Sequence, residues 1–188
     1  HLLRRAQQVH NALWAREVGT EPTSPQYAVL ASLAAAPGID QRRAAQLASL
    51  DTSSTMDVVG RLERAHWITK TRDAADRRRH VLTPTAAATL ALRQLQPRVK
   101  RVQDLLLAPL PVSRRADLVA DLADVARLDP DTPASSPLRI PGHLLRRAQQ
   151  VHTALFAAEL GGALTGPQFA ALHAIGDDPG LSQSDVGQ

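Results

Sequence analysis

The sequence predicts a mainly α-helical fold with one small β-hairpin, which belongs to the α+β class. Apolar residues recur at helical spacing along most of the first 128 residues, as in amphipathic helices. Two short runs rich in β-branched residues, 67–71 and 79–83, flank a polar, charged segment and indicate a hairpin. Residues 1–19 return almost unchanged at 143–161, so the chain also contains a repeat.

The first two helices are predicted from apolar spacing and from helix-end signals. Gly19 ends the first helix, one face of which would carry four apolar residues: Leu2, Ala6, Val9 and Leu13. The pair Ser24-Pro25 is typical of an N-cap followed by proline in the first turn, and predicts a second helix that ends before Pro37.

A short helix over 41–48 and a longer one over 51–66 follow, and the hairpin comes after them. Thr83-Pro84 is predicted to start a long helix to about Leu107, kinked at Pro97, and 111–128 reads as a last helix. The order of helix, short helix, turn, helix and hairpin is that of a winged helix-turn-helix. We therefore expect a DNA-reading domain over about 37–83, flanked by helices over about 1–19 and 84–128.

The repeat divides the chain into one complete unit and part of a second. The offset is 143 − 1 = 142, and more than half of the positions compared between 1–46 and 143–188 are identical. Segment 129–142 has four prolines among Ser, Thr and Asp, which predicts a linker. Residues 1–128 then form the complete unit, and 143–188 cover the first helices of a second, either because the natural protein runs on or because it was cut.

Composition narrows the possible functions. The net charge is +4, and segment 41–83 alone holds nine basic and five acidic residues, which favours a polyanion as partner. The absence of cysteine excludes disulfides and thiolate chemistry. The sequence shows no enzyme motif, no secretory signal and no apolar run long enough to span a membrane, so we expect a cytoplasmic non-enzyme without cofactor or metal. The abundance of Ala and Arg fits a high-GC bacterial coding bias.

The geometry of a winged helix selects the candidate DNA-binding residues. The reading helix points its first turns at the major groove, and the hairpin tip reaches the neighbouring minor groove, whose negative potential attracts arginine. Asp76 could orient one of the tip guanidiniums. The predicted contacts are Ser53, Ser54, Thr55, Asp57 and Arg61 from the helix, and Arg72, Arg77, Arg78 and Arg79 from the hairpin.

Residues 50–86 resemble the MarR family of bacterial transcription regulators. The similarity lies in the helix end Arg61-Leu62-Glu63-Arg64, the wing Asp76-Arg77-Arg78 and the closing Leu82-Thr83. The family usually has a glycine where His66 stands, and closes with LT-x-x-G where this chain has Ala86-Ala87. The resemblance implies a dimer, with the dimerisation helices over about 1–19 and 84–128. This dimer would bind a palindromic operator in double-stranded DNA and be released by a small ligand, as a repressor would be.

The opening RRAQQVH, together with SPQYAVL and PGIDQ, looks like the branch of this family that responds to aromatic acids. That similarity implies a pocket for an aromatic carboxylate or phenolic ligand between the first two helices and the reading domain. An arginine would hold the carboxylate, and rings would stack on the aromatic body. The matching positions are Arg4, Arg5, His10, Trp14 and Tyr27.

Two units on one chain could pair as an intramolecular pseudo-dimer, or exchange helices with a second chain as a swapped dimer. We expect the second unit to complete the dimer interface and its pocket. An alternative from another functional class is a winged helix used as a protein-interaction or scaffolding module, without sequence-specific DNA binding. The steep salt dependence of DNA binding would separate the two.

Overall fold

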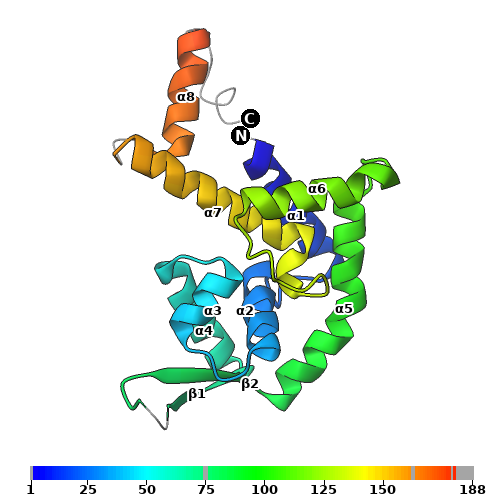
Figure 1. The fold of residues 1–188 in the computed structure, drawn as a ribbon, viewed down its shortest axis with the longest axis vertical. Coiled ribbons are helices and arrows are strands. Elements are labelled where there is room, and N and C mark those ends of the chain that lie inside the picture. The colour runs from blue at the N-terminus through cyan, green and yellow to red at the C-terminus, as the bar shows by residue number, and fades with distance from the viewer. Residues whose placement is uncertain (1, 74–75, 162–163, 179, 181–188) are drawn as a thin grey trace.

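The computed structural model of the chain describes residues 2–73, 76–161, 164–178 and 180. It confirms the predicted class, because the described residues form helices and one two-stranded sheet, which lies at the end of the molecule opposite α8 (Figure 1). Within these residues, none of the helices is long and apolar enough to cross a membrane. In chain order the elements are α1 (Leu2–Glu17), α2 (Ser24–Ala35), α3 (Gln41–Ala48), α4 (Thr52–Arg64), β1 (Ile68–Arg72), β2 (His80–Pro84), α5 (Ala86–Leu107), α6 (Val112–Val125), the 3-10 helix η1 (Pro137–Arg139), α7 (Pro141–Glu159) and α8 (Gly166–Asp177).

Helices α2, α3 and α4 pack with the sheet into the winged helix-turn-helix. Strands β1 and β2 are antiparallel, with Ile68 opposite Pro84 at the base and Arg72 opposite His80 toward the tip. A bridge between Asp40 and Val81 ties the segment before α3 to β2. The fully buried leucines of α2, α4 and β2 form the centre of this domain: Leu30, Leu33, Leu62 and Leu82.

Two helix starts differ from the prediction. Thr23, rather than Ser24, is the N-cap of α2, because Thr23 and Gln26 form a capping box in which each side chain accepts from the other's backbone N–H. Thr85, rather than Thr83, caps α5, since Thr83 and Pro84 still pair in the hairpin. Helix α5 continues through Pro97.

The predicted apolar face of α1 is also wrong in part. Leu2 and Val9 are 82% and 53% exposed, whereas His10 and Trp14 are buried. His10 and Trp14 lie four residues apart, so they share one face of the helix. The face that packs inward therefore includes a polar residue that a hydrophobic pattern does not count.

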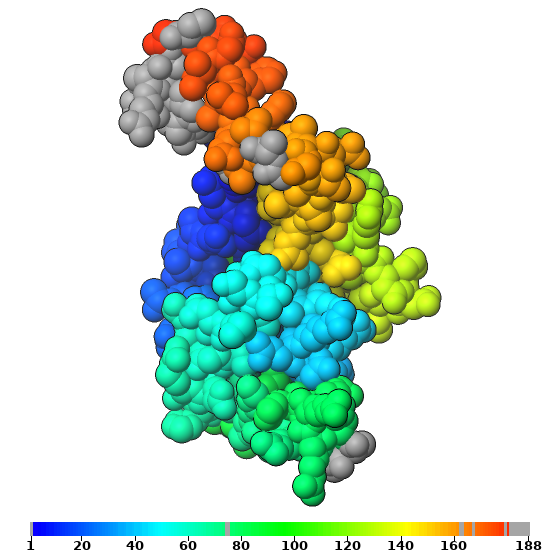
Figure 2. Space-filling model, turned by 90° about the vertical axis from the view of Figure 1, so that its left-hand side faces the viewer, coloured from blue at the N-terminus to red at the C-terminus, as the bar shows by residue number. Residues whose placement is uncertain are grey.

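Helix α7, the second copy of α1, packs against the helices of the first unit. It begins at Pro141, two residues before the predicted start of the second unit at 143, and contacts α1 and α6 (Figure 2). Its buried side chains share an apolar cluster with the end of α6, formed by Leu122, Ala123, Ala126, Leu144, Leu145 and Ala148. The first and last helices of residues 1–128 thus meet the helix whose sequence repeats that of α1.

Helix α8 repeats α2 but projects from the end of the molecule (Figure 1). Its residues Phe169, Leu172 and Ile175 are 43%, 55% and 46% exposed. The matching residues of α2 are buried within the winged helix-turn-helix: Tyr27, Leu30 and Leu33. The two copies therefore place the same helix in different surroundings.

We expect Gly142→Ala to destabilise the chain by about 1–3 kcal/mol, the usual cost of overpacking. A Cβ at Gly142 would overlap the imidazole ring of His10, so α7 would have to move away from α1. Thermal unfolding measures the effect. The matched control is Gly176→Ala, because a Cβ at Gly176 meets open space in α8; an equal loss in both variants would contradict this packing.

Candidate functional site

Helix α4, the predicted reading helix, begins at a strong N-cap. The Asp51 carboxylate accepts the backbone N–H of Ser54 at 2.8 Å and the Ser54 hydroxyl at 2.8 Å. These hydrogen bonds lower the pKa of Asp51, because they favour its charged form. The hydroxyl of Ser54 is therefore engaged by its own helix cap.

The structure separates the predicted α4 contacts into exposed and buried residues. Ser53 is exposed, and Asp57 forms an exposed ion pair with Arg61, with 3.1 Å between Oδ2 and Nε. Thr55 is only 1% exposed, and its hydroxyl donates to the Asp51 carbonyl at 2.7 Å. A DNA contact through Thr55 is therefore not supported, since its side chain belongs to the helix-turn-helix core.

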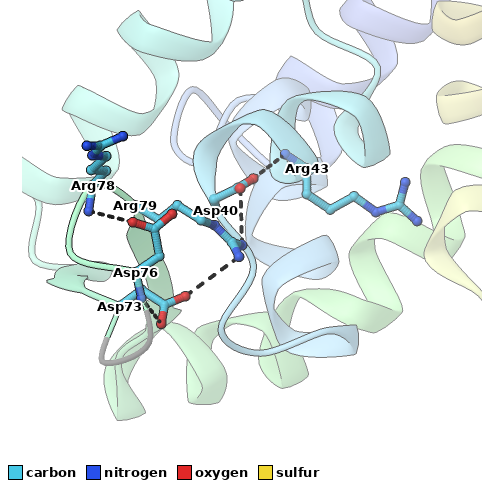
Figure 3. Close-up of polar contacts among 6 residues, drawn as sticks. All are labelled: Asp40, Arg43, Asp73, Asp76, Arg78 and Arg79. Carbon is cyan, nitrogen blue, oxygen red and sulfur yellow. Dashed lines mark hydrogen bonds and ion pairs between the residues drawn. The ribbon is translucent and has the colours of Figure 1, made fainter.

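The wing is held by a set of acid–arginine contacts (Figure 3). Arg79 pairs with Asp40 at 3.2 Å and with Asp73 at 3.7 Å, which ties the wing to the start of α3. The Asp76 carboxylate accepts the backbone N–H of Arg78 at 3.0 Å. Asp76 thus shapes the turn, and the acids that orient a guanidinium are Asp40 and Asp73, which the sequence-based interpretation did not assign to this role.

The tip of the wing presents cations to solvent. The side chains of Arg77 and Arg78 are exposed, as is Arg72 at the end of β1, while Arg79 is turned back toward Asp40. Because Arg79 occupies the nearby carboxylates, the exposed guanidiniums of Arg77 and Arg78 remain available to bind a polyanion. The wing and α4 therefore form one candidate nucleic-acid interface.

A chain of rings joins α1 to α2. The ring centroids of His10 and Trp14 are 5.9 Å apart, those of Trp14 and Tyr27 are 5.4 Å apart, and Trp14 Nε1 donates to the Pro22 carbonyl at 2.9 Å. Trp14 and Tyr27 border a small cavity with room for about one water. Its lining is formed by Trp14, Ser24, Tyr27, Ala28, Ala31, Pro137, Leu138, Ile140, His143 and Arg146.

The arginine of this cavity comes from the second copy. Arg146 of α7 lies 3.5 Å from the Ser24 hydroxyl, and its buried Nε has no hydrogen-bond partner among the described residues. Arg4 is half-buried, Arg5 is exposed, and neither lines the cavity. Arg146 is the repeat of Arg4, since 4 + 142 = 146. The repeat offset was the signal that could have identified it.

The cavity carries a positive charge without a matching carboxylate. Among the described ion pairs, none includes Arg146, and burial lowers its pKa to about 10. Burial and the charge of Arg146 lower the pKa of His10 to about 4 and that of His143 to about 3, where Arg147 also contributes. Both rings are therefore neutral near pH 7, and the site favours an anion.

The two buried histidines predict an acid-labile fold. Unfolded histidines bind protons below about pH 6.5, so each residue lowers the free energy of unfolding as the pH falls, by about 1.4 kcal/mol per pH unit. The free energy of unfolding falls between about pH 6.5 and the folded-state pKa of each histidine, which is about 4 for His10 and about 3 for His143. In urea titrations, His10→Asn and His143→Asn are expected to flatten this slope. A slope unchanged in both, or equally flattened by the exposed matched control His152→Asn, would contradict it.

Comparison with known proteins agrees with the fold. A model of the MarR family matches residues 19–79. A transcriptional regulatory protein for the hcr operon of Thauera aromatica is 33% identical over 71% of this chain and 81% of its own. The PcaV transcriptional regulator from Streptomyces coelicolor is 43% identical over 68% of this chain and 96% of its own, with a TM-score of 0.59, and its structure is also known with its natural ligand. The repressor CouR, solved on a 23-mer DNA duplex, is 29% identical over 67% of this chain and 90% of its own, with a TM-score of 0.62.

The chain belongs to the MarR family and is a transcriptional regulator of the MarR type. This confirms the prediction of a non-enzyme, since the family and these relatives are regulators. Membership of this family also disfavours the alternative of a protein-interaction or scaffolding module.

Proposed function

We propose that the chain is a DNA-binding repressor that a small aromatic acid releases from its operator. The observation that carries this proposal is the guanidinium of Arg146 beside the rings of Trp14 and Tyr27: its buried Nε has no hydrogen-bond partner, and no ion pair of Arg146 is found among the described residues. A charge kept out of water without a partner is costly, so such a site is expected to serve an anion. Its place in a regulator links that anion to control of DNA binding.

In this proposal the DNA-binding surface joins α4 and the wing. The helix enters the major groove with Ser53 and Arg61 forward, while Arg77 and Arg78 reach the minor groove beside it and Arg72 follows the backbone. Ser54, Asp57 and Arg79 support these contacts through their own partners. Two reading domains, from two units or two chains, would match a palindromic operator.

The proposed ligand places its carboxylate on Arg146 and its ring against Trp14 and Tyr27. An aromatic carboxylate does not fit the cavity as it stands. Four residues are shared with a wider groove between α2, α5 and the linker: Tyr27, Ala31, Pro137 and Ile140. A shift of η1 would join the two spaces, and we propose this as the route by which the ring enters.

We also propose that the chain pairs with itself as a pseudo-dimer. Its support is the packing of α7 on α1 and α6, the helices on which the family resemblance places the dimer. Light scattering after gel filtration is expected to give a mass near the 20.2 kDa of one chain. A concentration-independent mass of two chains would instead favour a swapped dimer.

DNA binding is tested with a labelled duplex from upstream of the protein's own gene, and with a scrambled duplex of equal length. We expect anisotropy to show preferential binding of the natural sequence, with log affinity falling by about 0.9 per phosphate contact for each log unit of salt. Absence of binding, or binding with a shallow salt dependence, would refute the DNA-binding proposal and favour the protein-interaction module.

A further inference from the structure

The start of α7 contacts both halves of the first unit. Gly142 donates its N–H to Oε1 of Gln103 in α5 at 2.9 Å and packs under the ring of His10 in α1. This part of α7 is therefore fixed on the dimerisation helices. The side chains that follow it reach the reading domain.

His143 contacts the turn of the helix-turn-helix. Its Nε2 lies 3.3 Å from the hydroxyl of Ser49, and both residues are only 2% exposed. Ser49 ends α3 with a φ of 53°, a left-handed conformation that is unfavourable for a residue with a side chain. Because the turn after α3 sets the direction of α4, a contact that holds Ser49 also constrains the reading helix.

Arg147 connects the same turn with the end of α6. Its guanidinium donates to the carbonyls of Ala126 at 2.8 Å and Arg127 at 3.1 Å, and to that of Gln46 in α3 at 3.5 Å. Carbonyls at helix C-termini carry partial negative charge and attract cations. One side chain of the second copy thus ties the dimerisation helices to the reading domain of the first.

We propose that His143 and Arg147 are positioning residues that set the orientation of α3 and α4 relative to the dimerisation helices. The inference rests on the proposed function only in taking α4 as the element that reads DNA. Arg146 lies between these two residues in sequence, so a ligand bound there acts on the helix that holds the reading domain. In this chain, the second copy therefore controls the first copy's DNA-binding surface in cis.

The orientation of α4 relative to α6 can be measured with spin labels on two introduced cysteines, because the chain contains no cysteine of its own. Met56→Cys on α4 and Val112→Cys on α6 provide two spin-label sites, which are 63% and 77% exposed in the native side chains. Pulsed dipolar spectroscopy on the full chain, diluted with unlabelled protein, gives the distance between the two helices within one molecule. It requires neither DNA nor ligand.

We expect Arg147→Ala and His143→Ala to shift and broaden this distance distribution. His143→Gln, which keeps a hydrogen-bonding group toward Ser49, is expected to restore it. Arg147→Lys keeps the cation at the end of α6 but loses the several N–H donors of the planar guanidinium. It is expected to broaden the distance distribution in a chain that remains folded. Arg114→Ala, on the exposed surface of α6, is the control for Arg147→Ala, because each variant removes one positive charge. Unchanged distributions in folded His143→Ala and Arg147→Lys would overturn the proposal.

A second readout separates positioning from DNA contact. The same variants are expected to lower DNA affinity about tenfold without changing its slope against salt, because no phosphate contact is removed. A changed slope would place Arg147 at the DNA and contradict positioning. If the chain bound no DNA, the proposed function would fail while the distance measurement would still decide this inference.

Discussion

Replacing both Arg77 and Arg78 by alanine is expected to lower DNA affinity at least about tenfold, and to reduce the slope of log affinity against log salt by about 1.8. Each guanidinium in the minor groove is taken to neutralise about one flanking phosphate, and each neutralised phosphate contributes about 0.9 to the slope. The two side chains are exposed at the wing tip, so their removal leaves the fold intact. Anisotropy titrations at several salt concentrations measure both quantities.

Two single variants serve as controls for the wing. Arg114→Ala removes the same charge from exposed surface of α6 and is expected to leave the slope unchanged. Arg79→Ala removes the ion pairs to Asp40 and Asp73, and is expected to lower wing stability more than it changes the slope. An Arg77→Ala/Arg78→Ala slope equal to that of wild type would show that the wing does not contact DNA.

Replacing Arg146 by methionine is expected to weaken binding of a benzoate-type acid by about 10- to 150-fold, the loss of about 1.5–3 kcal/mol from a charged hydrogen bond. The same change is expected to raise the melting temperature of the ligand-free chain, since an uncompensated buried charge is replaced by an apolar side chain of similar length. Loss of binding with gain of stability distinguishes a ligand site from a structural arginine.

Trp14 reports on this binding because it lines the cavity. In a Trp67→Phe background it is the sole tryptophan, so its fluorescence can be titrated with benzoate. The matched control is Arg4→Met, which alters the same residue of the repeated motif outside the cavity lining. If Arg4→Met weakened benzoate binding and Arg146→Met did not, the carboxylate would be assigned to the arginine of the first copy instead.

The sequence was sufficient for the fold class, the hairpin and the basic character of its tip. These depend on periodicity, β-branched runs and local charge, all of which act over a few residues. His10, Trp14 and Tyr27 form one chain of rings over a short separation in sequence, because α1 and α2 are adjacent in the chain.

The remaining features depend on tertiary contacts that local patterns do not encode. Arg79 is held by Asp40, which lies before α3, and Thr55 is buried because it lies on the face of α4 that packs against α2 and α3. The cavity arginine comes from position 146, although the motif itself occurs at both 4 and 146. Only the packing of α7 on the first unit decides which copy supplies it.

An acid bound between the two copies is proposed to control DNA binding by the first. The anisotropy of a chain–DNA complex during addition of benzoate, in wild type and in Arg146→Met, tests this control. Benzoate is expected to release wild type from DNA and to leave the Arg146→Met complex bound at the same concentrations. Equal release of both proteins, or release of neither while both bind DNA, would contradict it.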